Sequence, residues 1–530
     1  MKKNLPVSAF GLLSGLLLVW LLSGCVLADP DKTGRYDLER HLPAQIREPA
    51  DARGPFAFTV ESPPESLRLP SGETQDLTLS VEQAVMLSLA HNQDLKTRQL
   101  GPVIAGAFEQ MEKGRYDPEL FARIGVARVS DRLESEDVTV NAAAGVRRTL
   151  PFGTTVAAEA AHEQDRAPRT ADPDKTRLTL SMTQALLQGA GPAGGMVAIR
   201  QSELETRASI HELTAYVQAL VAETETAYWR YVLARQEHAI VERSLAVSKK
   251  QQTDVQHQID VGVLPRNEQA AVQSEVARRE QALIDSANQV EAFRLNLLHL
   301  IDPGGTHHLE RPVLPASDPA IDPDPVTDTD DRAALALKLR PDLAEARVRM
   351  QQNRLETIIT QNGLLPRLDF FMDLGFARFS RSSDALQSLY NSDYEIFAGL
   401  ALSRFVKNRS ARARHQAAVA THQQAAAALE NLSRTIHLDV RLAVNEIERA
   451  RQQIFASRVT RRSEEQTVQA EIERFNVGAG TALLVAQAQR DLLVSQIAEV
   501  RSVINYRIAL TRLFLSEGSL LQRRGIVMNE

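Results

Sequence analysis

A glycine-rich segment is the first candidate for chemistry in this chain, because residues Gly189 to Gly194 read Gly-Ala-Gly-Pro-Ala-Gly. This is the G-x-G-x-x-G pattern that holds a dinucleotide phosphate at a strand-to-helix turn. A dinucleotide fold also needs a second strand that ends in an acidic residue about 20 residues further on, and here a helical pattern simply continues. We therefore expect a flexible strand-to-helix crossover rather than a nucleotide site.

The histidines do not form a recognisable metal site. His211-Glu212 lacks the second histidine of a zinc-binding helix, and His307-His308 lies in a proline-rich segment without further ligands nearby. No nucleophile stands beside a base that could activate it. The sequence predicts no catalytic site, no cofactor and no metal site, and we do not expect an enzyme.

Cys25 is the residue whose setting predicts a chemical modification. Lys2 and Lys3 precede an apolar run from Phe10 to Leu22, which is shorter than the roughly 20 residues of a membrane-spanning helix. The run ends in Leu22-Ser23-Gly24-Cys25, which resembles a bacterial lipobox, so we expect cleavage before Cys25 and a lipid on Cys25. The alternative is an ordinary signal peptide cut after Ala28, which would discard the cysteine.

Composition narrows the class of protein and its partners. Cys25 is the only cysteine, so an internal disulfide is excluded. Val26 follows it, where an aspartate would be the usual signal for retention in the inner membrane. A net charge of -6 over 530 residues argues against a nucleic-acid partner. No other segment approaches a transmembrane helix, so a chain that crosses a membrane must do so as a closed β-barrel.

The elements that would position these residues occur twice. Two constant offsets relate residues of the first half to identical residues of the second half. The first offset pairs Leu87, Leu89, Asp94, Leu95, Pro118 and Leu120 with Leu335, Leu337, Asp342, Leu343, Pro366 and Leu368. The second pairs Gly262, Ala270, Gln273, Ala282 and Leu297 with Gly478, Ala486, Gln489, Ala498 and Leu513. Copies of about 200 residues are too long for solenoid units and indicate a duplicated half-protein.

Each copy is predicted to contain one very long helix. From about Met196 to Asp260, and again from about Val406 to Val477, proline is absent and glycine is nearly so. At 1.5 Å per residue these helices would be roughly 95–110 Å long. A helix of about 33 residues opens each copy, the first with Ser80 as its N-cap, and a turn followed by a helix of about 35 residues closes each copy. We expect the two shorter helices to stack end to end beside the long one.

Strands are predicted where apolar and polar residues alternate, in segments that begin at Leu120, Val138, Leu178, Leu368 and Tyr394. Strands of about 8–11 residues with one apolar face fit a transmembrane barrel, with lipid outside and water inside. A soluble β-sandwich has the same period. The helices favour the barrel, because their lengths are far above the globular mean of about 11–12 residues.

Together these features resemble the TolC-type outer membrane efflux protein family. The resemblance covers roughly residues 77–516 and rests on four sets of motifs. These are Leu79 to Ala84 with Asn92 to Leu95, Tyr116-Asp117-Pro118, Arg340 to Leu343 with Leu364 to Leu368, and the turns at Gly262 and Gly478. It implies a membrane α+β fold built from two internal repeats per protomer. Three protomers would pool their strands into one outer-membrane β-barrel, continued by a long periplasmic α-helical barrel.

The expected segments are a signal peptide (1–24), a lipid-anchored extended tether (25–76), a first repeat (77–301), a linker rich in proline and aspartate (302–331), a second repeat (332–516) and a C-terminal tail (517–530).

The resemblance also implies where partners bind. The two turns would ring the periplasmic mouth and meet a periplasmic adaptor through Gly262, Val263, Leu264, Gly478, Ala479 and Gly480. Ala270 is expected at an interior position of the helix after the first turn, where a proline would kink it.

A gate is expected just after the second turn. Some family members carry acidic residues there that make a cation-sensitive gate, but the corresponding positions here are Leu484 and Gln487. Three copies of Leu484, or of its neighbour Leu483, could instead form an apolar constriction that gates by dewetting. The alternative is that both leucines pack between helices.

The number of barrel strands is left open. The first copy has two additional alternating segments, 138–148 and 154–162, joined by the turn Leu150 to Gly153. If this turn is periplasmic, a trimer has an eighteen-stranded barrel, wider than the family's usual twelve. The alternative is an extracellular hairpin above a twelve-stranded barrel, which the weak apolar face of residues 154–162 favours slightly.

The function that follows is the outer-membrane channel component of a tripartite efflux or type I secretion system. The protein would be a homotrimer in the cell outer membrane, lipid-anchored, with a periplasmic helical extension. Its partners would be outer-membrane lipid, a periplasmic adaptor and an inner-membrane pump of antiporter or ABC type. The exported substrate, whether drug, metal or protein, is left open. The alternative is a periplasmic coiled-coil lipoprotein with a structural or adhesive role and no pore.

Overall fold

The computed structural model describes residues 59–60, 77–130, 136–165, 174–302, 308–380 and 393–527. The predicted signal peptide, Cys25 and nearly all of the predicted tether lie outside these residues. None of the helices within these ranges combines the length and the apolar character that a membrane span requires.

Each repeat contains one long helix. α6 (Val197–Asp260) has 64 residues and α10 (Arg409–Asn476) has 68, and neither contains proline or glycine. At 1.5 Å per residue they extend about 96 and 102 Å. The predicted long helices are therefore confirmed.

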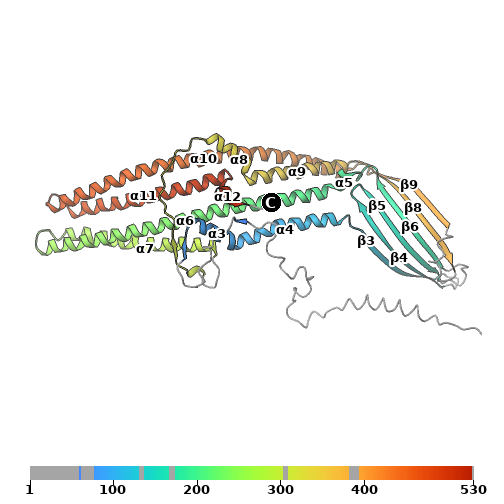
Figure 1. Ribbon diagram of the computed structural model, residues 1–530, viewed down its shortest axis with the longest axis horizontal. Helices are drawn as coiled ribbons and strands as arrows, with labels where there is room; N and C mark the ends of the chain where they lie inside the picture. Colours follow the sequence, from blue (N-terminus) through green and yellow to red (C-terminus); the bar gives the residue numbers. More distant parts are fainter. Residues whose placement is uncertain are drawn as a thin grey trace, which may run out of the picture. The chain divides into compact units, whose positions relative to one another are not determined.

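Each long helix lies beside two shorter helices that occupy different parts of its length (Figure 1). The long helix α6 contacts α4 (Gln93–Gly114) and α7 (Glu268–Ile301). The long helix α10 contacts α9 (Pro341–Asn362) and α11 (Ala482–Ser516). α6 also contacts α9 and α11, so the two repeats pack against each other along their helices.

The opening helix of each repeat is divided in two, whereas the sequence predicted one continuous helix. α3 (Val81–His91) ends at Asn92, whose side-chain oxygen accepts from Leu95 N at 2.9 Å and whose amide nitrogen donates to Leu300 O at 3.1 Å. α8 (Thr329–Leu339) ends at Arg340, which has an extended backbone because the ring of Pro341 disfavours a helical residue before it. The expected N-cap of α3 is confirmed, since Ser80 Oγ accepts from Gln83 N at 3.2 Å.

The main apolar core lies where α3, α6 and α7 meet. Tyr228 of α6 is fully buried there, and its hydroxyl donates to Leu79 O at 2.9 Å. Leu79 belongs to β2 (Leu77–Leu79), which pairs in parallel with β7 (Val313–Pro315), so part of the predicted linker is a strand fixed to the start of the first repeat. A short 3-10 helix, η3 (His308–Glu310), precedes β7.

A buried ion pair joins the first repeat to the predicted tail. The carboxylate of Glu225 on α6 is fully buried and accepts from Arg524 Nη2 at 2.9 Å and from Thr511 Oγ1 at 2.7 Å. Arg524 directly follows α12 (Leu520–Arg523). Near it, β10 (Ile526–Val527) pairs antiparallel with β1 (Thr59–Val60).

A six-stranded antiparallel sheet lies at one end of the helices (Figure 1). Its strands are β3 (Glu119–Ser130), β4 (Glu136–Leu150), β5 (Thr154–Asp165), β6 (Asp174–Ala185), β8 (Arg367–Ser380) and β9 (Asp393–Ser403), in that order. The first repeat supplies four strands and the second supplies two, and β6 pairs with β8 to join them. β4 and β5 are therefore full members of the sheet.

Candidate functional site

One face of the sheet is apolar across all six strands. The pairing register places side chains of successive strands in rows on that face. One row is Leu120, Val146, Ala158, Leu180, Leu374 and Ile396, and the next is Ala122, Ala144, Ala160, Leu178, Phe376 and Tyr394. Leu120 is 84% exposed and Ile396 is 62% exposed, so none of the residues that the structure describes covers the outer strands of this face. An uncovered apolar band of this kind is what a lipid-facing sheet requires.

The opposite face of the sheet is charged. Arg147 Nη2 lies 2.6 Å from Glu119 Oε2 across β3 and β4, and Arg123 Nη2 lies 2.9 Å from Glu159 Oε2. Further charges on this face come from Arg177, Asp373 and Glu395. This face has the polar character of a barrel lumen.

The turn between β4 and β5 lies at the helical end of the sheet. Gly191 N donates to Phe152 O at 3.0 Å, and Ala185 N donates to Gly153 O at 2.9 Å. An added Cβ on Gly153 would lie 2.4 Å from Gly189 O, and one on Gly195 would lie 2.0 Å from Pro151 O. The packing needs these glycines. Residues 189–194 connect β6 to the helical part, as predicted, and their flexibility stays a prediction.

The other strand ends meet at the same place. Tyr116, before β3, donates its hydroxyl to Gly195 O, and Arg148 Nε donates to Tyr116 O at 3.0 Å. Leu186 N donates to Leu368 O at 2.7 Å, which brings the end of β6 to the start of β8. The hairpin predicted as an alternative on the far side of the barrel therefore turns beside the helices. β4 has 15 residues and β5 has 12, so both are at least as long as β3 and β6, which have 12 each.

The two tips at the other end of the helices have matching geometry. At the end of α6, Val261 N donates to His257 O at 3.1 Å. Gly262 comes next with φ +79°, and Val263 N then donates to Gln258 O at 2.9 Å. After α10, Gly478 has φ +77°, and the corresponding bonds join Val477 N to Glu473 O at 3.1 Å and Ala479 N to Arg474 O at 2.8 Å. Glycine is required because left-handed φ is strained for other residues. Neither glycine has a neighbour that an added Cβ would meet, so both tips are open surface.

The structure joins the two tips to each other. Ala482 N, at the start of α11, donates to Glu268 Oε2, at the start of α7, at 2.9 Å. A carboxylate at a helix N-terminus is stabilised by the unpaired N–H groups and the helix dipole. A small apolar cluster lies beside this contact and contains Val255, Val272 and Ala482, with Ile259, Leu264 and Phe475 packed against it.

Sequence reasoning did not single out Glu268. An acidic residue in the first turn of a helix was an available signal. That signal does not say which helix the carboxylate caps, and here it caps a helix of the other repeat.

The predicted gate residues lie in the first two turns of α11. Leu483 is 51% exposed and Leu484 is 43% exposed, and Gln487 is also exposed. Within the protomer, the leucines are therefore not packed between helices. Ala482 and Val485 take the buried positions instead.

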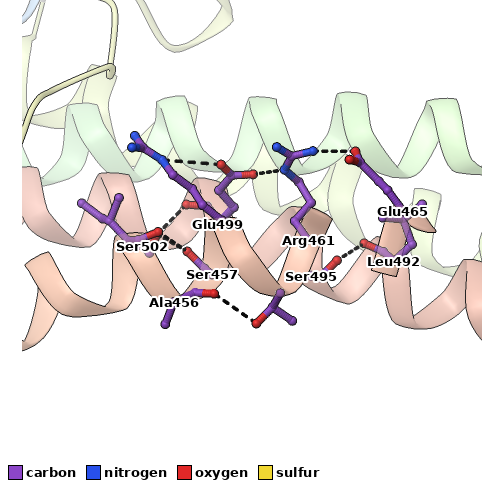
Figure 2. Close-up of polar contacts among 11 residues, drawn as sticks. Ala456, Ser457, Arg461, Glu465, Leu492, Ser495, Glu499 and Ser502 are labelled. Carbon is purple, nitrogen blue, oxygen red and sulfur yellow. Dashed lines mark hydrogen bonds and ion pairs between the residues drawn. The ribbon is translucent and has the colours of Figure 1, made fainter. Parts of the chain in front are cut away.

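Polar contacts join α11 to α10, as Figure 2 shows. Ser457 Oγ and Ser502 Oγ are 3.0 Å apart, and Arg461 donates to Glu499 and, at 2.5 Å, to Glu465. The pKa of the Arg461 guanidinium is raised, because hydrogen bonds to the two carboxylates outweigh the burial that opposes its charge. The second tip is therefore carried by a helix pair joined through a hydrogen bond between hydroxyls and an ion pair.

The family model of outer membrane efflux proteins matches residues 333–519, which contain most of the second repeat. This match confirms the resemblance that the sequence motifs indicated. No curated protein sequence matches the chain.

Solved outer-membrane channels have the same fold. VceC of Vibrio cholerae is 17% identical over 83% of this chain and 96% of its own, with a TM-score of 0.63. CmeC of Campylobacter jejuni is 15% identical over 88% of this chain and 92% of its own, with a TM-score of 0.62. The open state of MtrE of Neisseria gonorrhoeae is 16% identical over 88% of this chain and 96% of its own, with a TM-score of 0.60.

Proposed function

We propose that this protein is the outer-membrane channel of a tripartite efflux or type I secretion system. The match of the outer membrane efflux family model to the second repeat supports this proposal. The observation that carries the proposal is the six-stranded sheet, which has one continuous apolar face and one charged face and continues into helices about 100 Å long. A sheet of this kind suits lipid on one side and water on the other.

The chain functions as a homotrimer. Alone, the sheet ends in two open edges, β3 and β9, and unpaired strand edges are not tolerated in lipid. Three sheets joined edge to edge leave no free edge and form a barrel of eighteen strands. The position of the β4–β5 turn beside the helices supports this number over twelve.

The proposal also assigns roles to the remaining parts of the chain. A lipid on Cys25 anchors the start of the mature chain in the outer membrane, and the helices extend into the periplasm. The tips at Gly262 to Leu264 and Gly478 to Gly480 contact a periplasmic adaptor, which couples the channel to an inner-membrane pump. Leu483, Leu484 and Gln487 narrow the periplasmic mouth, a role that their exposure in the protomer supports.

The channel is tested by reconstitution. We expect the purified full chain to migrate faster on gels before heating than after, and to give discrete conductance steps in a planar lipid bilayer. A periplasmic coiled-coil lipoprotein without a pore would show neither behaviour, and that result would overturn the proposal.

The strand number is tested by cysteine labelling in intact cells. Gly153 is unsuitable because its φ of +82° and its contact with Gly189 O leave no room for a side chain. Phe152 lies in the same turn and is 57% exposed, and Asp174 begins β6 at the opposite end of the sheet. With an impermeant maleimide, we expect Asp174→Cys to label in intact cells and Phe152→Cys to label only after permeabilisation. Labelling of Phe152→Cys from outside would rule out eighteen strands.

A further inference from the structure

A cavity lined by four arginines lies on the helices, away from both the sheet and the tips. Its volume is about 340 Å³. The guanidinium groups come from Arg230 on α6, Arg449 on α10, and Arg501 and Arg512 on α11. Among the described residues that line it, Glu446 is the one carboxylate. The cavity is therefore strongly positive in composition.

Two of these arginines are already paired. Arg449 binds Glu446 through both carboxylate oxygens, at 2.8 and 2.6 Å, and Arg501 Nη2 lies 2.8 Å from Glu237 Oε1. The pKa of the Glu446 carboxyl is lowered, chiefly by the hydrogen bond from Arg449 and to a smaller extent by the charge of Arg512, so Glu446 remains ionised.

The other two arginines have guanidinium N–H groups available to a ligand. Within the described part of the chain, the side chains of Arg230 and Arg512 have no hydrogen-bond or salt-bridge partner. Each guanidinium presents a planar fork of N–H groups that matches the geometry of a carboxylate or sulfonate. Two such forks in one cavity favour an anionic ligand.

The rest of the wall is apolar. Phe293 of α7, Leu233 of α6 and Ile508 of α11 line the same cavity. Ile508 is buried, whereas Leu233 and Phe293 are half-buried, so a ligand could still cover apolar surface there. An aromatic or aliphatic body attached to the anionic group would gain free energy from that contact.

The cavity shares a stripe of α11 with the proposed gate. Residues at spacings of four and seven lie on one side of a helix. On α11 these residues are Leu483, Gln487, Val494, Arg501, Asn505 and Arg512. Arg507 lies on another side, where it donates to Ala320 O at 2.8 Å and Pro319 O at 3.2 Å of the linker. The linker thus covers one side of α11, and the stripe is left exposed. If the gate residues face the channel axis, so does the arginine cavity.

We propose that this cavity binds organic anions that carry a carboxylate or sulfonate on an apolar body, as cargo moving through the helical conduit. The inference rests on the proposed channel function and adds a substrate class to it. Positive groups in a confined passage raise the local concentration of anions, which would favour such cargo over cations of the same size.

Equilibrium dialysis of the purified full-length protein in a neutral detergent tests the binding. The probe is 2-naphthalenesulfonate, its cationic counterpart is trimethyl-2-naphthylammonium, and protein-free micelles give the background. We expect saturable binding of the sulfonate and none of the ammonium compound. Arg230→Gln and Arg512→Gln should each weaken sulfonate binding about tenfold, because each removes a charge-assisted hydrogen bond. Arg434→Gln, which changes an exposed arginine on α10 paired with Glu430, should leave it unchanged.

Two results would overturn the inference: equal binding of the two probes, or sulfonate binding that neither cavity variant weakens. Dialysis does not require a pore, so it judges the cavity even if the bilayer experiment fails. Conductance without sulfonate binding would leave the channel in place and remove only its anionic cargo.

Discussion

The contact between the two tips predicts a local effect that can be measured. Glu268→Ala removes the carboxylate that accepts from Ala482 N at 2.9 Å and leaves the first turn of α11 without that acceptor. Loss of a capping side chain costs about 1 kcal/mol, and loss of a negative charge at a helix N-terminus costs about 0.3–1 kcal/mol more. Thr481 Oγ1 still accepts from Leu484 N, at 3.4 Å, so the turn is weakened rather than lost. We expect the start of α11 to lose about 1–2 kcal/mol of local stability.

Hydrogen–deuterium exchange of the full protein, read by mass spectrometry on peptides that cover residues 478–490, measures this loss. A decrease of about 1–2 kcal/mol in the opening free energy makes exchange about 5–30 times faster at residues 482–485. Glu268→Gln keeps an acceptor oxygen without the charge and should give a smaller increase.

Glu280→Ala is the matched control. Glu280 is also on α7, and its carboxylate lies 2.8 Å from Lys249 Nζ with both side chains about half exposed. An exposed pair of this kind contributes about 0–1 kcal/mol. The reasoning is refuted if Glu268→Ala leaves exchange at residues 482–485 unchanged, or if Glu280→Ala accelerates it equally.

Three further predictions concern the anchor, the core and the tip helix. Cys25→Ala should abolish incorporation of radioactive fatty acid and leave the precursor unprocessed, and normal labelling of the variant would contradict lipidation at Cys25. Glu225→Ala removes a fully buried carboxylate from Arg524 and Thr511, so it should cost about 1–3 kcal/mol and lower the thermal midpoint, whereas Glu430→Ala on the surface should not. Ala277→Pro lies in the interior of α7 and should remove exchange protection around residue 277 at a cost of about 3 kcal/mol, while Ala270→Pro, in the first turn of the same helix, should be tolerated. Equal loss of protection in both proline variants would show that the helix begins earlier than Glu268.

The last comparison corrects an expectation from the sequence. Ala270 was expected at an interior position of the helix that follows the first turn. In the structure residues 265–267 still belong to the turn, and α7 begins at Glu268. Pro265 and Asn267 in this short stretch are compatible with either position for the start of the helix.

Local features were predictable and distant contacts were not. The capping box of Ser80 and the length of α6 depend only on neighbouring residues, so the sequence predicted both. The break at Asn92 depends on Leu300 O, 208 residues away, and the cap of α11 depends on Glu268, 214 residues away. The arginine cavity needs side chains from separate helices, and no spacing within one segment reveals it.

Each repeat's strands begin and end at the helical end of the sheet, and this restricts the number of strands that a repeat can contain. β3 leaves the helical end of the sheet and β6 returns to it, and β8 and β9 do the same in the second repeat. Any repeat that enters and leaves on the same side must therefore hold an even number of strands. One additional hairpin, placed as β4 and β5 are in the first repeat, would keep every helix in place and change only the circumference of the sheet. Because barrel diameter grows roughly in proportion to strand number, the width of the proposed barrel and the width of its helical extension can be selected separately.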